Sequence, residues 1–280
     1  MVQAETTTGF STHSLHYLCQ IVEQDSGILL DESKRYLLDA RLKPLIQTEG
    51  ISSLDQLCAA LQGGQKTLRR KVVEAMATHE SLFFRDTAPF DALREVILPE
   101  LVERRSWLRR LSFWCAACSS GQEPYSLAML LCETLPQIDS WAIDILASDI
   151  SEPILKRARE ARYMQLEVNR GLPVQYLVKY FERAHMDWVV KPKIRDMVKF
   201  QYLNLMDDFQ DLGKFDVVMC RNVMIYFDVD RKKQILAGIR QVLAPDGYLL
   251  LGGSETVFSL DDNYERVAMG QATYYRLRSP

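Results

Sequence analysis

Two cysteines and a glutamate lie within residues 113–130, which read FWCAACSSGQEPYSLAML. Cys115 and Cys118 have the C-x-x-C spacing that disulfide oxidoreductases and zinc sites use. Glu123 follows a turn of small residues and precedes Pro124, so its carboxylate can accept hydrogen bonds from hydroxyl or amino groups of a ligand. These residues alone therefore allow thiol redox chemistry, metal binding or ligand binding.

The positions of the thiols argue against the first two kinds of chemistry. A redox thiol needs a helix N-terminus to lower its pKa, but Cys115 falls within an apolar run and the next helix is expected to begin near Pro124. A zinc site needs further ligands at metal spacing, and the remaining candidates stand singly. They are Cys19, Cys58, Cys132, Cys220, His13, His16, His79 and His185. We interpret the cysteines as packing residues and expect no metal site.

The loop SSGQEP and a second acidic residue favour a nucleoside ligand without phosphates. Gly121 allows a ligand to approach the backbone, but the loop lacks the G-x-G-x-x-G pattern, and Glu123 would repel a phosphate. Asp149 ends another apolar run 28 residues after Gly121, where Rossmann-like folds place the acid that holds ribose hydroxyls. S-adenosylmethionine fits these features. The alternative role for Asp149 is a helix cap, which Ser151 can provide equally well.

The elements that position these residues fall into two parts of the chain. Residues 10–85 carry apolar residues at helical spacing, which predicts a small helical domain in which a fourth helical run extends from residue 67 to residue 86. From residue 111 short apolar runs alternate with helical segments, which predicts βαβ units and a mostly parallel sheet.

The predicted fold class is therefore α/β, with an N-terminal helical domain followed by a Rossmann-like domain. We predict domain limits of 1–88 for the helical domain, 89–110 for a helical connector and 111–280 for the Rossmann-like domain. Alternating and β-branched residues predict a small antiparallel β subdomain inserted at about 165–200.

The composition narrows the class of protein. The chain of 280 residues is 48% hydrophobic and has a formal net charge of −3, so we expect no nucleic-acid partner. It has no run of about 18 apolar residues and no secretion signal at its start, so we expect no membrane insertion. Six cysteines in a chain of this length indicate reduced thiols, and we predict a cytoplasmic protein.

Several segments together resemble the chemotaxis receptor methyltransferases of the CheR type. They are THESLFFRD, CSSGQEPYSLAM, ASDIS, RGLPVQYLVKYF, NL at 204–205, FDVVMCRNVMIYFD and LGGSE, in family order from residue 78 to residue 255. The resemblance implies a class I methyltransferase fold and a protein-glutamate O-methyltransferase. Such an enzyme uses S-adenosylmethionine to form methyl esters on glutamate side chains of chemoreceptor helices, and it releases S-adenosylhomocysteine.

The resemblance also implies roles for individual residues. Tyr226 resembles the aromatic hydroxyl that faces the transferred methyl group, and Arg85 resembles an arginine that contacts the cofactor, so both are expected to be catalytic. The expected cofactor-binding residues are His79, Ser81, Arg85, Glu123, Asp149, Asn204, Leu205, Arg221 and Asn222. Two of them depart from the family pattern, because His79 and Ser81 stand where Asn and Thr are frequent. Gln122 stands where Glu is usual.

A receptor substrate suggests a use for two groups of basic residues. One group on a predicted helix face is Lys66, Arg69 and Arg70, and the other is Arg104, Arg105, Arg109 and Arg110. Each group either docks a receptor or is a solvated surface. Some family members bind a receptor C-terminal pentapeptide through a longer, glycine-containing loop of the inserted subdomain. Here residues 182–198 (ERAHMDWVVKPKIRDMV) form a short segment without glycine, so we predict independence of that pentapeptide. The resemblance also implies a monomer.

Two other functions remain open on the sequence alone. One is a methyltransferase that acts on a small molecule or RNA, although the negative net charge disfavours RNA. The other is a sensor that binds the cofactor without catalysis. The retention of the expected site residues argues against it; they are Arg85, Glu123, Asp149, Arg221, Asn222 and Tyr226. No general base is predicted, because a glutamate substrate is already ionised at neutral pH.

Overall fold

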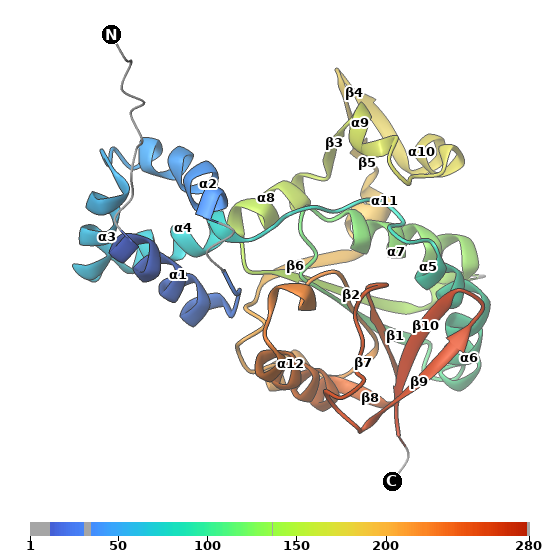
Figure 1. The fold of residues 1–280 in the computed structure, drawn as a ribbon. Helices are drawn as coiled ribbons and strands as arrows, with labels where there is room; N and C mark the ends of the chain where they lie inside the picture. The colour runs from blue at the N-terminus through green and yellow to red at the C-terminus, as the bar shows by residue number, and fades with distance from the viewer. Residues whose placement is uncertain (1–11, 31–34, 136, 279–280) are drawn as a thin grey trace. The chain divides into compact units, whose positions relative to one another are not determined.

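The structure, a computed structural model, describes residues 12–30, 35–135 and 137–278. The chain forms two compact units, Met1–Thr78 and His79–Pro280. The first unit is helical, and the second is built around a large sheet (Figure 1).

The first unit consists of α1 (Thr12–Ser26), α2 (Arg35–Thr48), α3 (Leu54–Gln62) and α4 (Lys66–Met76). Their apolar faces form one core, to which Leu18, Val22, Leu42, Leu57 and Val72 contribute side chains with at most 1% exposure. The predicted helical domain is confirmed. One helix end differs, because the predicted fourth run continued to residue 86, whereas α4 ends at Met76.

The end of α4 has a physical cause within the first unit. Ala77 leaves the helical conformation with ψ 145°. The Arg41 guanidinium donates hydrogen bonds to the carbonyl oxygens of Met76 at 2.6 Å and Ala77 at 3.2 Å, and to the Thr78 hydroxyl at 3.0 Å. It thereby satisfies carbonyl groups that a helix end leaves without a partner.

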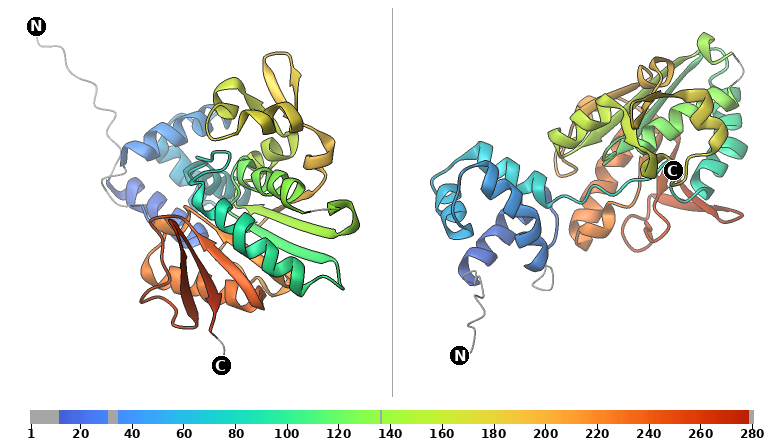
Figure 2. Two further views of the ribbon diagram at one scale, coloured as in Figure 1. Left: turned by 90° about the vertical axis from the view of Figure 1, so that its right-hand side faces the viewer. Right: turned by 90° about the horizontal axis from the view of Figure 1, so that it is seen from above.

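The second unit contains a seven-stranded sheet in the order β6-β2-β1-β7-β8-β10-β9 (Figures 1 and 2). The strands are β1 (Arg110–Ala116), β2 (Ala142–Asp149), β6 (Val198–Tyr202), β7 (Phe215–Cys220), β8 (Leu243–Leu251), β9 (Tyr264–Met269) and β10 (Ala272–Leu277). The first five strands in this order are parallel, whereas β10 is antiparallel to both β8 and β9. The strand order reverses its direction at β1, so the carboxyl ends of β1, β2 and β7 form a switch point where ligands bind in such sheets.

The central strands are buried on both faces, which explains their continuous apolar sequence. In β1 the Trp114 ring packs edge-on against Phe209 with ring centroids 5.0 Å apart, while Phe113 and Cys115 belong to the core on the other face. The surrounding helices are α5 (Ala88–Ala92), η2 (Leu93–Ile97), α6 (Leu98–Arg104), α7 (Gln122–Thr134), α8 (Glu152–Glu160) and α12 (Val229–Val242). The predicted α/β class is confirmed. The helix expected to begin near Pro124 begins at Gln122.

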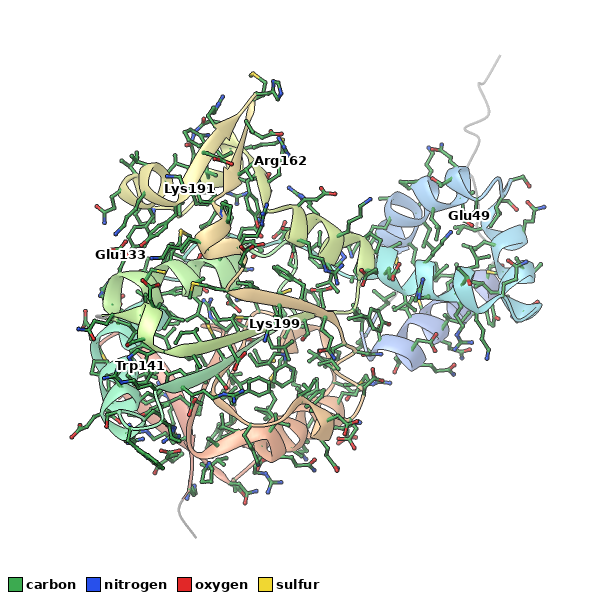
Figure 3. The ribbon with its side chains drawn as sticks, turned by 180° about the vertical axis from the view of Figure 1, so that it is seen from behind. Glu49, Glu133, Trp141, Arg162, Lys191 and Lys199 are labelled. Atoms are coloured by element: carbon green, nitrogen blue, oxygen red, sulfur yellow. The ribbon has the colours of Figure 1, made fainter. Side chains whose placement is uncertain are left out.

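A small antiparallel sheet in the order β3-β5-β4 is inserted between α8 and β6. It comprises β3 (Arg162–Met164), β4 (Phe181–Ala184) and β5 (Asp187–Val190), with α9 (Gln165–Val168) and α10 (Val174–Tyr180) between the first two strands and α11 (Pro192–Arg195) after the third. Glu133 on α7 is labelled in Figure 3. It accepts hydrogen bonds from Lys179 and Tyr180 on α10, which connect this subdomain to a helix of the main α/β fold. The predicted antiparallel element is present, but Val198–Tyr202, which begins inside the predicted range 165–200, pairs with β2 in the main sheet.

Candidate active site

The loop after β1 has an unusual backbone at the switch point of the sheet. Ala117 and Ser119 have φ of 55° and 51°, and Gly121 has φ of 93°. A side chain at Gly121 would place its Cβ 3.1 Å from the Tyr163 hydroxyl and 3.2 Å from the Ala158 Cβ, so glycine is required there. Non-glycine residues in the left-handed region are strained, and such strain gathers at functional sites. The loop is therefore built to a fixed shape.

Asp149, at the end of β2, holds this loop in place. Its Oδ2 accepts a hydrogen bond from the Ser119 N–H at 2.8 Å, and its Oδ1 accepts one from the Ser151 N–H at 3.1 Å. Burial raises the pKa of Asp149 above its usual range, and the His79 ring, with Nδ1 4.0 Å from Oδ1, opposes that shift. Each carboxylate oxygen can accept a further hydrogen bond. Asp149 therefore retains acceptor capacity for ligand hydroxyls.

Arg221, directly after β7, contacts two of the other expected site residues, Glu123 and Arg85. Its side chain is 1% exposed. Nη1 donates to Glu123 Oε2 at 2.7 Å, and Nη2 donates to the Arg85 carbonyl at 2.6 Å and to Asp86 Oδ2 at 3.2 Å. Burial raises the pKa of Glu123, while Arg221 pulls it down. The structure thus brings Arg85, Glu123 and Arg221 together, and it adds Asp86, which the sequence did not single out.

The phenylalanine pair before Arg85 anchors this segment. Phe83 packs edge-on against Tyr163 and Phe181 with ring centroids 4.9 and 5.6 Å apart. The Phe84 N–H donates to the Ser126 hydroxyl at 3.0 Å. Phe84 and Asp86 have φ of 49° and 53°, so Arg85 stands between two left-handed residues. The FFRD motif therefore fixes the position of Arg85 through its neighbours.

Asn222 and Tyr226 lie in the turn that follows β7. Asn222 is left-handed with φ of 57°, and Tyr226 ends the short 3-10 turn Met224–Tyr226 and is half-buried. Glu255, after β8, accepts a hydrogen bond from the Asn222 N–H at 2.7 Å. Glu255 belongs to the segment LGGSE but is not among the expected site residues. It stands four residues after Leu251, the last residue of β8, so an acid directly at a strand end, the signal that identified Asp149, does not point to it.

The remaining expected residues have simpler surroundings. Asn204 and Leu205 follow β6, and the Leu203 N–H donates to the Asp149 carbonyl at 3.0 Å, which places this segment beside Asp149. The Asn204 side chain accepts a hydrogen bond from the Met206 N–H at 3.1 Å. Ser81 lies in the irregular segment that leads to Phe83 and is half-buried.

The cysteines have the character of core residues. Cys115 lies inside β1, as predicted, and Cys118 lies in the loop that follows it. Burial raises the pKa of Cys115, Cys118 and Cys220 well above the usual value, which keeps the thiols protonated and weakly nucleophilic. Among the described residues, no group of three or more His, Cys, Asp or Glu side chains is placed to hold a metal ion.

A cavity of about 460 Å³ adjoins the Arg221 network. Asp86 and Glu255 line it and also belong to the contacts described above. Its other walls include Arg266 and Gln271 from β9 and the turn before β10. The site therefore has space beside Arg221 for part of a substrate.

These features fit S-adenosylmethionine, which carries positive charge and ribose hydroxyls. Asp149 and Glu123 are acceptors for hydroxyl and amino groups, and neither favours a phosphate. Five buried side-chain polar atoms of the described residues have no hydrogen-bond partner, and two of them, Ser119 Oγ and Arg221 Nε, belong to this site. Buried polar groups of this kind are normally satisfied, so a ligand at this switch point would supply what the chain lacks.

Comparison with known families agrees with this geometry. The family model described as "CheR methyltransferase, SAM binding domain" matches residues 79–273, and the one described as "CheR methyltransferase, all-alpha domain" matches residues 13–77. With the sheet order, these matches confirm the predicted fold class, a helical domain followed by a class I methyltransferase fold, and the predicted cofactor S-adenosylmethionine.

Individual relatives cover nearly the whole chain. A protein named Chemotaxis protein methyltransferase 1 from Pseudomonas aeruginosa is 43% identical over 262 residues, which are 92% of this chain and 95% of the relative. Chemotaxis protein methyltransferase Cher2 from Pseudomonas putida is 43% identical over 263 residues, with the same coverage of both chains. Chemotaxis protein methyltransferase 1 from Vibrio cholerae is 38% identical over 277 residues, 98% of this chain and 100% of the relative.

Proposed function

The chain belongs to the CheR family of S-adenosylmethionine-dependent methyltransferases of chemotaxis, and from this premise we propose its reaction and substrate. The proposed reaction transfers the methyl group of S-adenosylmethionine to glutamate side chains of chemoreceptor cytoplasmic helices, giving glutamate methyl esters. The observation that carries the proposal is the pair of buried carboxylates, Glu123 and Asp149, at the carboxyl ends of the central strands. They suit a cofactor without phosphates, and the half-buried Arg85 suits a carboxylate substrate.

The proposed cofactor-binding residues are those of the sequence analysis. Asp149 would accept hydrogen bonds from ribose hydroxyls, and Glu123 from the amino group, with Arg221 keeping Glu123 in place. The remaining members of the set are His79, Ser81, Arg85, Asn204, Leu205, Arg221 and Asn222. When bound, S-adenosylmethionine supplies an electrophilic methyl group.

The chain's own task is to hold the substrate carboxylate and to keep water away. A glutamate is ionised at neutral pH, so no residue has to remove a proton. Tyr226 and the Arg85 guanidinium are the proposed donors that orient the carboxylate. They must hold it no more tightly than the transition state, in which its charge decreases. Phe84 and Asp86 fix the Arg85 backbone, which limits where its guanidinium can reach.

Receptor docking is assigned to the basic face of α4. Lys66, Arg69 and Arg70 are the proposed residues. Arg69 forms an ion pair with Asp25 at 2.6 Å, and Arg70 lies 3.6 Å from Glu74. No ion pair of Lys66 occurs among the described residues. The positive charge of Lys66 is therefore the one on this face that an acidic receptor helix could bind without first breaking an ion pair.

The inserted subdomain supports independence from a receptor pentapeptide. Only His185 and Met186 connect β4 to β5, so the hairpin has no long loop to embrace a peptide. Tight binding of a C-terminal receptor pentapeptide that contains Trp and Phe would contradict this part of the proposal. We also propose that the enzyme is a cytoplasmic monomer. Among the described helices, none combines the length and apolar character that crossing a bilayer requires.

The decisive experiment uses a receptor cytoplasmic fragment and S-adenosylmethionine labelled in its methyl group. The expected product is a labelled protein that releases methanol in mild base, because carboxyl methyl esters hydrolyse readily. A matched fragment with its candidate glutamates changed to alanine should accept no label. Label that resists base, or that appears in both fragments, would show that the substrate is another group.

A further inference from the structure

One carboxylate joins the two loops at the centre of the site without a role in the proposed chemistry. Glu255 Oε2 accepts hydrogen bonds from the N–H groups of Asn222 and Gly252, each at 2.7 Å. Its Oε1 accepts one from the Met224 N–H, also at 2.7 Å. A single carboxylate therefore collects three backbone donors, two from the loop after β7 and one from the loop after β8.

These bonds hold a strained residue. Asn222 is left-handed with φ of 57°, a conformation that asparagine adopts more readily than most residues but still at a cost. The bonded N–H groups belong to the peptide planes before Asn222 and before Met224, so they fix the backbone on both sides of Asn222 and Val223. Hydrogen bonds to an ionised carboxylate are about twice as strong as those between neutral groups. Glu255 can therefore compensate the strain.

Gly252 shows how closely these groups are packed. A Cβ at Gly252 would lie 2.6 Å from Glu255 Oε2, 2.7 Å from Asn222 Nδ2 and 2.9 Å from the Asn222 nitrogen. Any side chain at this position would displace the carboxylate or the asparagine. Glycine therefore leaves the space in which Glu255 reaches Asn222, and the Asn222 amide lies against the Gly252 backbone.

We propose that Glu255 is a positioning residue that holds Asn222 in its left-handed conformation and thereby aims the Asn222 amide into the cofactor site. The inference rests on the proposed function, which assigns Asn222 to cofactor binding. It adds that the acid of the LGGSE segment acts through the backbone of the neighbouring loop and not by touching the cofactor. Glutamine at 255 would place an NH2 group against backbone N–H donors, so it would weaken the arrangement without removing the side chain.

Calorimetric titration of S-adenosylhomocysteine into the full chain and into Glu255→Gln tests the proposal. We expect the dissociation constant to rise on the order of tenfold in the variant. Glu265→Gln is the matched control, because Glu265 is an exposed acid on β9 that undergoes the same chemical change, and it should bind as the wild type does. Absence of binding by the wild type would overturn the proposed function itself. Wild-type affinity in Glu255→Gln would overturn only the positioning role.

A double-mutant cycle separates positioning from general stabilisation. Glycine adopts the left-handed conformation without support from Glu255, and it has no side-chain amide to position. In an Asn222→Gly background, adding Glu255→Gln should therefore change the dissociation constant by less than about twofold. Full, additive losses from the two changes would overturn the proposal. Thermal melting of each variant verifies folding. If Glu255→Gln does not fold, Glu255→Asp, which keeps the charge on a shorter side chain, enters the same cycle with the same expected coupling.

Discussion

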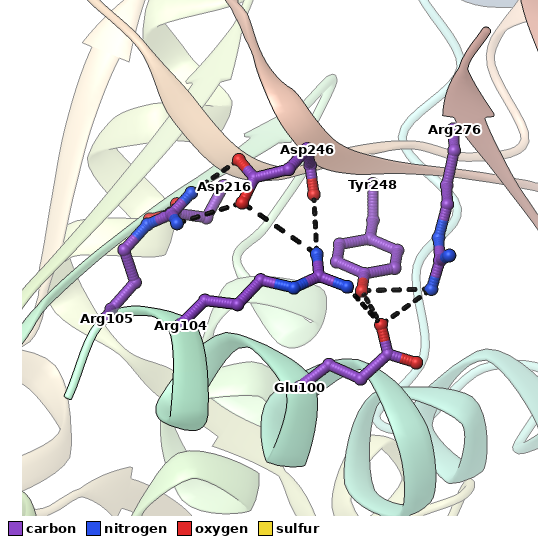
Figure 4. A network of polar contacts seen from close by, with 7 residues as sticks. All are labelled: Glu100, Arg104, Arg105, Asp216, Asp246, Tyr248 and Arg276. Carbon is purple, nitrogen blue, oxygen red and sulfur yellow. Dashed lines mark hydrogen bonds and ion pairs between the residues drawn. The ribbon is translucent and has the colours of Figure 1, made fainter. Parts of the chain in front are cut away.

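The two ends of the main sheet carry networks of charged residues whose carboxylates have pKa values shifted in opposite directions. At the amino ends of β7 and β8, Arg105 forms a bidentate pair with Asp246 at 2.9 and 2.7 Å and contacts Asp216 at 2.9 Å (Figure 4). The hydrogen bonds from Arg105 lower the pKa of Asp246. At the carboxyl ends, burial raises the pKa of Glu123 although Arg221 lies beside it, and burial also raises the pKa of Asp149.

This difference separates a network that stabilises the fold from one that prepares a site. A buried carboxylate with sufficient donors favours the charged form, whereas one whose burial outweighs its partners carries a desolvation cost. The first kind contributes to stability. The second kind is maintained where a ligand completes the missing contacts. The carboxylates at the carboxyl end of the sheet therefore carry a desolvation cost, which hydrogen bonds to a bound cofactor can offset.

The same comparison decides between the two groups of basic residues. Arg104 forms ion pairs with Glu100 at 2.7 Å and with Asp246, and Arg110 pairs with Asp144 at 2.9 Å. Three of the four connector arginines are thus paired within the protein, and Figure 4 shows Arg104 and Arg105 in the network that includes Tyr248 and Arg276. We therefore propose the α4 face, and not the connector group, for receptor docking.

The largest expected effect follows loss of Arg221. Arg221→Met leaves Glu123 buried without its cation, and we expect the free energy of unfolding to fall by about 3–5 kcal/mol. Urea denaturation followed by circular dichroism measures it. The double variant Arg221→Met/Glu123→Gln should recover part of the loss, because no uncompensated charge remains. If the double variant is as unstable as Arg221→Met, the loss does not come from an uncompensated charge on Glu123. The proposed difference between the carboxylates at the two ends of the sheet would then be wrong.

Asp149 should matter more for the ligand than for the fold. Asp149→Asn removes charged acceptors for ribose hydroxyls, and we expect affinity for S-adenosylhomocysteine to fall about 100-fold, since hydrogen bonds to charged groups contribute roughly 1.5–3 kcal/mol each. Isothermal titration measures the affinity, and thermal melting verifies folding. Affinity equal to that of the wild type would show that this acid only holds the backbone at Ser119 and Ser151.

Arg105 should behave in the opposite manner. Arg105→Met leaves Asp216 and Asp246 without their shared cation, and we expect a loss of about 2 kcal/mol in unfolding free energy, less than for Arg221 because Asp246 is 40% exposed. Affinity for S-adenosylhomocysteine and turnover per folded molecule should stay at the wild-type value. A change in either would mean that the two ends of the sheet are coupled.

The pH dependence of stability should distinguish the two carboxylates. The folded pKa of Asp246 is lowered from 3.8, so its contribution is present above the unfolded pKa and is lost only as the pH falls through the lower folded value. The folded pKa of Asp149 is raised from 3.8, so its contribution is present below the unfolded pKa and is lost as the pH rises through the folded value.

The measurement is urea denaturation of the wild type, Asp149→Asn and Asp246→Asn at about pH 7 and about pH 4, close to the unfolded pKa of both aspartates. The wild type should gain stability relative to Asp149→Asn at the lower pH, because the raised pKa of Asp149 favours its protonated form there. The wild type should lose stability relative to Asp246→Asn, because the lowered pKa of Asp246 favours its ionised form. Parallel behaviour of the two variants would refute the assignment.

The sequence predicted the elements that follow local rules. Glu123 was identifiable because it stands at the start of the helix that follows the small-residue loop, and Asp149 because it ends an apolar strand. The order of residues alone reveals both positions. Val198–Phe200 was assigned to the inserted subdomain because alternating and β-branched residues run through this segment. In the structure only Val198 of β6 is buried, as befits an edge strand with one polar face. Its partner, β2, lies about 50 residues earlier in the chain and leaves no trace in the local pattern.

The sequence did not predict a role for Glu255, for a related reason. Its three donors come from loops after two strands that are adjacent in space but separated by α12 in the chain. Sequence spacing cannot show that one carboxylate reaches both loops. The positive φ of Asn222 was equally invisible, since asparagine is common in many turns. Residues that act through the backbone of another loop are thus the ones that sequence reasoning misses.

The smallest expected effect concerns receptor docking. Lys66→Glu reverses an exposed charge on α4, and we expect the KM for a receptor fragment to rise about three- to tenfold at low salt, with cofactor affinity and turnover at saturation unchanged. The difference should shrink as salt increases, because exposed charges are screened. Lys233→Glu, an equal charge reversal at an exposed position of α12, is the matched control. Equal effects of both reversals would indicate a response to net charge. The basic face of α4 would then be ordinary solvated surface with no part in receptor docking, as proposed above for the connector group.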